Sequence, residues 1–144
     1  MTPSRSSIPG RSLSPGTAEG IVLRLDEPLS FWGGLDAETG EIVDRRHPQV
    51  GVNVTGTILV MERGRGSSSG SSVFAEAIRN GTAPSAIVMA ELDEIVALGA
   101  IVADEIYGIK VPVVVVSPSD HSLLIDGSAI RVSASVDTAT VHAP

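Results

Sequence analysis

The chain contains no cysteine among its 144 residues. It therefore cannot by itself form a disulfide framework, present a thiolate nucleophile, or hold a cysteine-ligated metal ion or iron-sulfur cluster. Cationic side chains are also scarce, because 10 Lys and Arg stand against 17 Asp and Glu, giving a formal net charge of -7. Nucleic acids and anionic membrane surfaces bind clustered Lys and Arg, so the composition argues against either as the main partner.

Long hydrophobic runs are missing too. No stretch is long enough to span a bilayer, and residues 1–16 lack the apolar core of a signal peptide, so we expect a soluble, cytoplasmic protein. Those first residues are rich in Ser, Pro and Arg and carry few large apolar side chains. We therefore expect a flexible N-terminal tail over residues 1–16 and one domain over residues 17–144.

Short apolar runs alternate with amphipathic segments in the middle of the chain. The runs at 57–61, 86–90 and 111–116 are rich in β-branched residues and uninterrupted by polar ones, which is typical of strands covered on both faces. Between them, residues 71–79 and 92–106 place apolar side chains at helical spacing. This order predicts an α/β fold with a parallel β-α-β core and extra strands at both ends.

The segment GRGSSSGSS, residues 64–72, joins the first of these strands to the first helix. Its glycines permit close backbone approach and positive φ, and the start of a helix offers unpaired N–H groups that favour an anion. One interpretation is therefore an anion or oxyanion site. The other is that the serines cap the helix and the glycines fit a tight turn, with no ligand.

Three segments carry a family resemblance. They are LDEPLSFWGGLDAETGEIVDRRHP (25–48), GRGSSSGS (64–71) and GTAPSAIVMAELDEIVALGAIVADE (81–105). In this order they closely resemble the small subunit, or swivel domain, of the aconitase X proteins. The resemblance implies a swivelling β/β/α barrel-like domain, as in the aconitase swivel domains. Such a domain closes over a large subunit whose cysteines hold an iron-sulfur cluster.

The resemblance also implies a catalytic residue. In the aconitase and isopropylmalate isomerase swivel domains the matching loop reads Gly-x-Gly-Ser-Ser-Arg-Glu, and its first serine, ionised, is the base that moves a carbon-bound proton. By position that serine is Ser67, and we expect no metal ligand on this chain. The remaining loop residues are expected to bind substrate: Gly64, Arg65, Gly66, Ser68 and Ser69.

The match breaks at Ser69, which stands where those relatives have arginine. An arginine clamp on a substrate carboxylate therefore cannot be carried over to that position, and Arg65, Arg45 and Arg46 are possible substitutes. This departure suggests a substrate unlike citrate.

The function implied by the resemblance is that of a hydro-lyase subunit, active only with its large subunit. The partner's iron-sulfur cluster would act as Lewis acid on the leaving hydroxyl of a small hydroxy acid. We favour dehydration of cis-3-hydroxy-L-proline to pyrroline-2-carboxylate, with phosphomevalonate dehydration as the alternative. An alternative of another class is a non-catalytic, anion-binding regulatory module.

Other side chains allow two interpretations each. Phe31 and Trp32 could line the mouth of the site or the subunit interface, or could fill the core. His47 could bind substrate or a partner, or could be solvated or structural. The acidic residues of two further segments are expected in a turn and in the first turn of a helix, respectively: Asp36, Glu38 and Asp44, and Glu91, Asp93 and Glu94. His121 and His142 receive no role.

Overall fold

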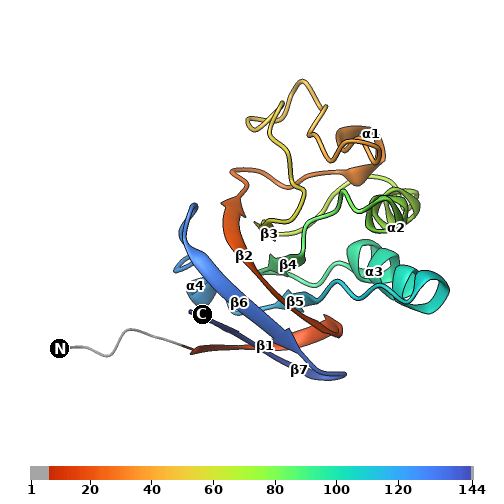
Figure 1. Cartoon of the computed structure of the whole chain (residues 1–144). Helices are drawn as coiled ribbons and strands as arrows, with labels where there is room; N and C mark the ends of the chain where they lie inside the picture. Colours follow the sequence, from red (N-terminus) through yellow and green to blue (C-terminus); the bar gives the residue numbers. More distant parts are fainter. Residues whose placement is uncertain (1–6, 144) are drawn as a thin grey trace.

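The computed structural model describes residues 7–143, and the strands among them close into one barrel (Figure 1). Around the barrel the order is β1-β5-β4-β3-β2-β6-β7. The strands are β1 (Ser7–Ser14), β2 (Gly16–Arg24), β3 (Ile58–Val60), β4 (Ala86–Met89), β5 (Val113–Val115), β6 (Ala129–Ala134) and β7 (Thr138–His142). The helices are α1 (Phe31–Gly34), α2 (Gly70–Asn80), α3 (Glu94–Tyr107) and α4 (Pro118–His121).

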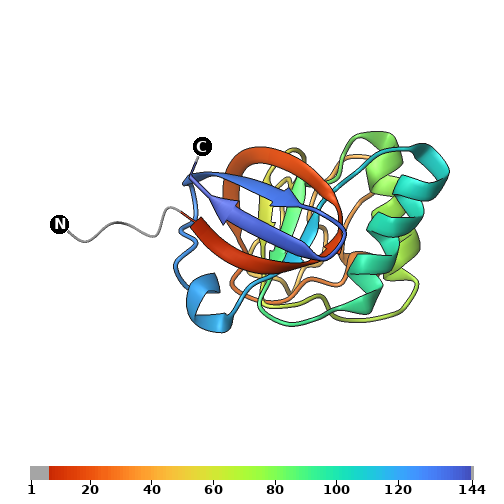
Figure 2. The same cartoon turned by 90° about the horizontal axis from the view of Figure 1, so that it is seen from below.

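Strands β2 to β5 form the parallel part of the barrel. β2 pairs with β3, β3 with β4 and β4 with β5, all in parallel. Helices α2 and α3 connect these strands and lie together on one outer side, whereas α4 lies on the opposite side (Figure 2). The predicted α/β class with a parallel β-α-β core is confirmed. None of the helices within residues 7–143 is long and apolar enough to cross a bilayer.

The three central strands are buried on both faces, which explains why their sequences are uninterrupted apolar runs. On β3, Ile58 and Val60 belong to a cluster in the barrel interior that includes Val132 of β6. Leu59, between them, belongs to a second cluster, which contains Phe74 of α2. The parallel sheet therefore separates two cores, one enclosed by the barrel and one covered by α2 and α3.

The N-terminal strand corrects one expectation from the sequence. Residues 7–14 form β1, which pairs antiparallel with β5 on one edge and with β7 on the other, so a tail over residues 1–16 is wrong for this part. Residues 1–6 lie outside the described residues. Pairing of this polar strand relies on backbone groups and on close approach: a Cβ on Gly10 would lie 2.9 Å from the Val115 carbonyl oxygen.

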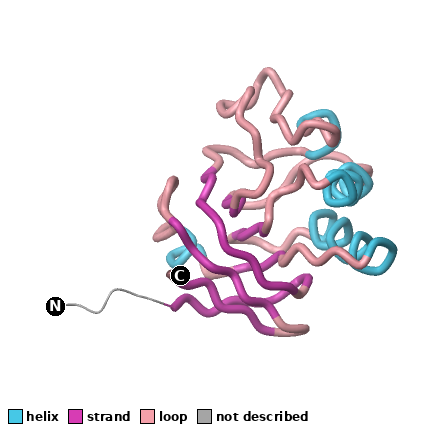
Figure 3. Tube along the Cα trace, viewed as in Figure 1, coloured by secondary structure: helices cyan, strands magenta, loops and turns pink. Residues whose placement is uncertain are grey.

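Residues 25–57 form a lobe at one end of the barrel that is almost entirely loop (Figure 3). The acidic segment in it is a tight turn, as expected. The Glu38 N–H donates to Asp36 Oδ1 at 2.9 Å, and Gly40 adopts φ of +80°.

His47 links two segments of this lobe through hydrogen bonds of its ring. Its ring is buried, and Nδ1 accepts a hydrogen bond from the Gln49 N–H at 3.0 Å. Nε2 therefore carries the proton and donates to the Glu27 carbonyl oxygen at 3.0 Å. Both ring nitrogens are used by the backbone, so the structural interpretation of His47 is the one that the geometry supports.

Candidate active site

The loop between β3 and α2 lies at the carboxyl edge of the parallel strands. The Ala90 and Glu91 N–H groups, just after β4, donate to the Glu62 carbonyl oxygen, just after β3, at 3.0 and 3.1 Å. The segments that follow neighbouring strands therefore meet here. Ligands of parallel α/β sheets bind outside the carboxyl ends of the strands, so the loop is placed where a binding site is expected.

Two glycines of the loop have no room for a side chain. A Cβ on Gly64 would lie 2.7 Å from Asp93 Oδ2, and one on Gly66 would lie 2.2 Å from Ser30 Oγ. Gly66 also adopts φ of +94°, a conformation that other residues rarely tolerate. The loop is thus clamped between the start of α3 on one side and the segment that begins α1 on the other.

Ser67 lies in the exposed part of the loop, which comprises residues 65–69. Its Oγ accepts a hydrogen bond from the Ser69 N–H at 3.1 Å. A backbone N–H directed at a hydroxyl oxygen favours its ionised form, because the positive end of the donor faces the developing charge. Ser67 therefore combines a backbone donor on its oxygen with access from solvent.

The first turn of α2 is less open to an anion than the sequence suggests. The N–H groups of Gly70 and Ser71 donate to the carbonyl oxygens of Ser67 and Ser68, at 2.9 and 3.2 Å, and Ser72 repeats this pattern. The N-cap residue is Ser69, whose side chain makes no capping hydrogen bond. The expectation that these N–H groups are unpaired is wrong, because tight i to i−3 turns already satisfy them.

Among the arginines considered from the sequence, Arg65 belongs to the loop itself. Its guanidinium lies 3.7 Å from Glu27 Oε1 and 3.9 Å from Asp44 Oδ2, and its side chain is 42% exposed. Arg45 and Arg46 are exposed in the turn that follows Asp44. Exposed ion pairs at such distances contribute little, about 0–1 kcal/mol, so Arg65 can exchange these partners for a ligand carboxylate.

The two aromatic residues near the loop have different environments, one in the core and one at the surface. Phe31 is buried and stacks on Phe74 of α2, with ring centroids 5.0 Å apart. Trp32 is 58% exposed, and its backbone nitrogen lies 3.7 Å from the place where a Gly70 Cβ would be. Phe31 is therefore a core residue, and Trp32 borders the loop.

His121 is a second buried histidine at the carboxyl edge, beside a polar hollow of about 330 Å³ that Arg24, Asp26 and Glu62 also line. Its Nε2 lies 3.0 Å from the Met61 carbonyl oxygen, and its Nδ1 lies 3.4 Å from the Arg24 guanidinium. Burial, and then the charge of Arg24, lower the pKa of His121 below its usual value. The ring is therefore neutral near pH 7, donating from Nε2 and accepting at Nδ1.

This geometry predicts a pH dependence of stability. Because the folded pKa of His121 is depressed, the unfolded chain takes up the proton first as the pH falls, and the free energy of unfolding should fall below about pH 6.5. The slope from this group is at most about 1.4 kcal/mol per pH unit. Urea unfolding between pH 7.5 and 5.5 measures it. His121→Gln should remove this part of the slope and His142→Gln should keep it; equal slopes in all three proteins would contradict the prediction.

No group of three or more His, Asp or Glu side chains within residues 7–143 is placed to hold a metal ion. Asp93 caps α3, since its Oδ1 accepts from the Ile95 and Val96 N–H groups at 2.9 and 3.1 Å, and Glu94 follows in the first turn as expected. With no cysteine in the sequence, the side chains of this chain do not fit an iron-sulfur cluster.

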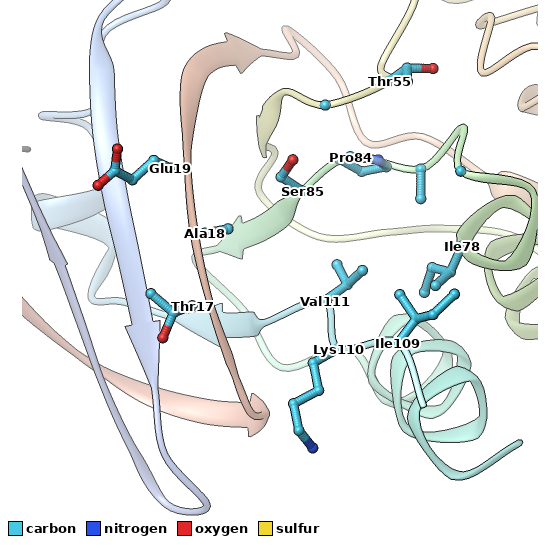
Figure 4. A pocket seen from close by; sticks show the side chains of 13 residues that line it. Thr17, Ala18, Glu19, Thr55, Ile78, Pro84, Ser85, Ile109, Lys110 and Val111 are labelled. Carbon is cyan, nitrogen blue, oxygen red and sulfur yellow. The ribbon is translucent and has the colours of Figure 1, made fainter. Parts of the chain in front are cut away.

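Another hollow, of about 390 Å³, lies at the opposite edge of the parallel strands (Figure 4). Its lining includes Thr55, Ser85 and Val111, which precede β3, β4 and β5 respectively. These are amino ends of strands, whereas the Ser67 loop follows a carboxyl end. This hollow is therefore separate from the candidate site.

The sequence does not indicate that two distant residues, Ser30 and Asp93, shape the loop. They lie against Gly66 and Gly64 across separations of about 36 and 29 residues respectively, and only the fold brings them together. A local pattern could identify Asp93 as a helix cap, but neither residue as a neighbour of the loop.

A closed barrel with a parallel half, two helices on one side and a serine loop at the carboxyl edge defines an α/β swivel-type domain. The family model for the aconitase X swivel domain matches residues 7–141. The chain belongs to this family, and the resemblance drawn from the three sequence segments is confirmed.

Individual relatives differ in how much of their length the chain covers. It is 48% identical over 103 residues to a cis-3-hydroxy-L-proline dehydratase of Pseudomonas aeruginosa, covering 72% of this chain but 18% of that protein. It is 37% identical over 129 residues to the phosphomevalonate dehydratase small subunit of Methanosarcina acetivorans, covering 89% of this chain and 85% of the relative.

The crystal structure of Thermococcus kodakaraensis aconitase X in its holo-form superposes with a TM-score of 0.81 and 39% identity, over 94% of this chain and 97% of that one. The swivel-domain fold expected from the resemblance is therefore confirmed.

Proposed function

We propose that the chain is the small subunit of an aconitase X type hydro-lyase that dehydrates cis-3-hydroxy-L-proline to pyrroline-2-carboxylate, and that it is active only with a large subunit. The single observation that carries the proposal is the environment of Ser67. The residue sits on a glycine-fixed loop at the carboxyl edge, exposed, with the Ser69 N–H on its Oγ. The 48% identity to the Pseudomonas dehydratase supports the choice of substrate.

Ser67 acts as the base in this proposal. Its ionised Oγ removes the proton from the carbon next to the substrate carboxylate, and the electrons of that C–H bond form a C=C bond as the neighbouring carbon loses its hydroxyl group. The proton and the hydroxide together leave as water. With cis-3-hydroxy-L-proline the product of this step is an enamine, and transfer of a proton from its nitrogen to carbon gives pyrroline-2-carboxylate. A serine anion is a strong base that needs stabilisation, and the Ser69 N–H and the amino end of α2 supply part of it. The covering partner excludes water and strengthens these interactions.

The rest of the loop would orient the substrate. We propose that the backbone of Gly64 and Gly66 and the hydroxyls of Ser68 and Ser69 line the site. Arg65 would leave its weak ion pairs with acidic side chains and bind the substrate carboxylate. It would then take the role of the arginine that the relatives have at the position of Ser69. The iron-sulfur cluster would be held by cysteines of the large subunit, where it would supply Lewis-acid assistance to departure of the hydroxyl group.

The alternative substrate is phosphomevalonate. The observation in its favour is the extent of the match, since the alignment with the Methanosarcina phosphomevalonate dehydratase small subunit spans 89% of this chain, whereas that with the Pseudomonas hydroxyproline dehydratase spans 72%. Both substrates present a carboxylate and a hydroxyl group, the two groups on which the proposed dehydration depends.

The test is an assay of the complex of this chain with its large subunit on both substrates. We expect a kcat/KM for cis-3-hydroxy-L-proline at least about 100-fold above that for phosphomevalonate, because a site shaped for one polar substrate leaves groups unpaired with the other. The reverse preference would assign the chain to the phosphomevalonate enzymes. Turnover of neither substrate by an intact complex would contradict the proposal.

A further inference from the structure

Two exposed apolar side chains border the Ser67 loop on opposite sides. On one side Trp32 is 58% exposed, and its neighbour Ser30 lies against Gly66. On the other side Leu92 is 52% exposed, and its neighbour Asp93 lies against Gly64. Large apolar side chains scattered singly on a surface need no explanation, but these two are attached to the segments that clamp one functional loop.

The apolar surface continues from Leu92 along α3. Leu92, Ala97, Leu98 and Ile101 line a shallow groove together with Glu94, and Leu98 and Ile101 are 50% and 42% exposed. These helical positions share one face of α3, whereas Val96, Ala100 and Ala103 are buried in the core. Figure 1 shows α1, α2 and α3 in one column. Helix α2, which directly follows the Ser67 loop, is in the middle.

We propose that this rim, defined as Trp32, Leu92, Leu98 and Ile101, is the surface on which the large subunit of the same enzyme docks. The inference rests on the proposed function. Ser67 is exposed, so its site is incomplete until a second surface covers it, and a partner that covers the loop must contact both flanks. The named relatives support one occupant over others, since one is itself a small subunit and the other continues into a much longer chain.

Within the described residues, a second apolar groove offers a competing location. It lies beside α4, where Leu123 is 53% and Ile125 is 69% exposed. Helix α4, beside which this groove lies, is on the side of the barrel opposite α2 and α3 (Figure 2). The residues that line this groove belong to neither of the segments that clamp the Ser67 loop, so the site geometry favours the rim.

The test measures the dissociation constant of the full chain and its separately purified large subunit by calorimetry. Trp32→Ala should raise it at least about 30-fold, as expected for an aromatic anchor of an interface, and Leu98→Ala about 5-fold or more. Leu123→Ala is the matched control, with the same chemistry and nearly equal exposure, and should bind like the wild type. Thermal unfolding confirms that the variants are folded.

Each outcome bears on the proposal. Unchanged affinity in Trp32→Ala and Leu98→Ala, or a loss confined to Leu123→Ala, would overturn the rim and leave the dehydratase proposal standing. Loss in the rim variants, with a complex that turns over neither substrate, would support the rim and overturn the proposed activity. A wild-type chain that does not bind the large subunit would overturn both.

Discussion

Replacement of Ser67 by alanine is expected to lower kcat of the complex about 100- to 10,000-fold while the complex remains intact. The magnitude is that of a lost general base. Alanine removes the oxygen that accepts the Ser69 N–H, and no other hydroxyl of the loop has a backbone donor in the same arrangement within the described residues. Because the proposed site holds the substrate carboxylate through groups other than Ser67, we expect KM to change much less than kcat.

The assay compares Ser67→Ala with Ser72→Ala, which removes a hydroxyl group from an exposed serine of the same helix start. The control should retain at least about half of the wild-type kcat. Full activity in Ser67→Ala would remove the catalytic assignment. An anion-binding regulatory module would instead bind a carboxylate or phosphate in the absence of the large subunit, which calorimetry on the isolated chain detects.

A methyl group on Gly66 is expected to displace the loop and lower kcat at least about 100-fold. Gly66→Ala forces a left-handed φ of +94° on alanine and brings its Cβ within 2.2 Å of Ser30 Oγ, so the loop must move away from the segment that holds it. A shift of about 1 Å in a catalytic group is enough for a loss of this size. The free energy of unfolding should fall by about 1–3 kcal/mol.

Gly51→Ala distinguishes the backbone strain of a positive φ from the contact with Ser30 as the cause of a lower kcat. Gly51 has a similar φ of +90°, but a Cβ there meets nothing within 4 Å, so it carries the backbone strain without the contact. We expect a destabilisation of about 1–2 kcal/mol and a normal kcat. The double variant Ser30→Gly with Gly66→Ala lacks the Ser30 Oγ and Cβ that would face the new alanine side chain. Its kcat should therefore recover in part. No recovery there would mean that the strain at Gly66, and not Ser30, displaces Ser67.

Much of the fold could be predicted because both faces of the central strands are covered. That environment requires uninterrupted apolar runs such as the one around Leu59, and the runs are visible in the sequence. Strand β1 could not be predicted in the same way, since its polar residues are held by pairing with strands about 100 residues or more away. Local composition contains no record of a distant partner.

The candidate site, like the fold, could be predicted from the sequence only in part. The place of the loop between a strand and a helix, and the use of glycine at Gly64 and Gly66, could be predicted from the segment, whereas the choice of Ser67 came from the family resemblance. The donors actually available could not be, because tight turns use the first N–H groups of α2 and leave Ser69 as the donor to Ser67. Nor could the division between Phe31 and Trp32, which depends on which ring faces Phe74.

The placement of β1 between β5 and β7 has a consequence for synthesis of the chain. During translation β1 and β2 leave the ribosome well before the partners of β1, which are residues 113–115 and 138–142. The barrel therefore cannot close until the chain has been synthesised through residue 142, and contacts of such long sequence separation slow folding. Until then the strand edges of the nascent chain stay unpaired and available to chaperones or to other chains.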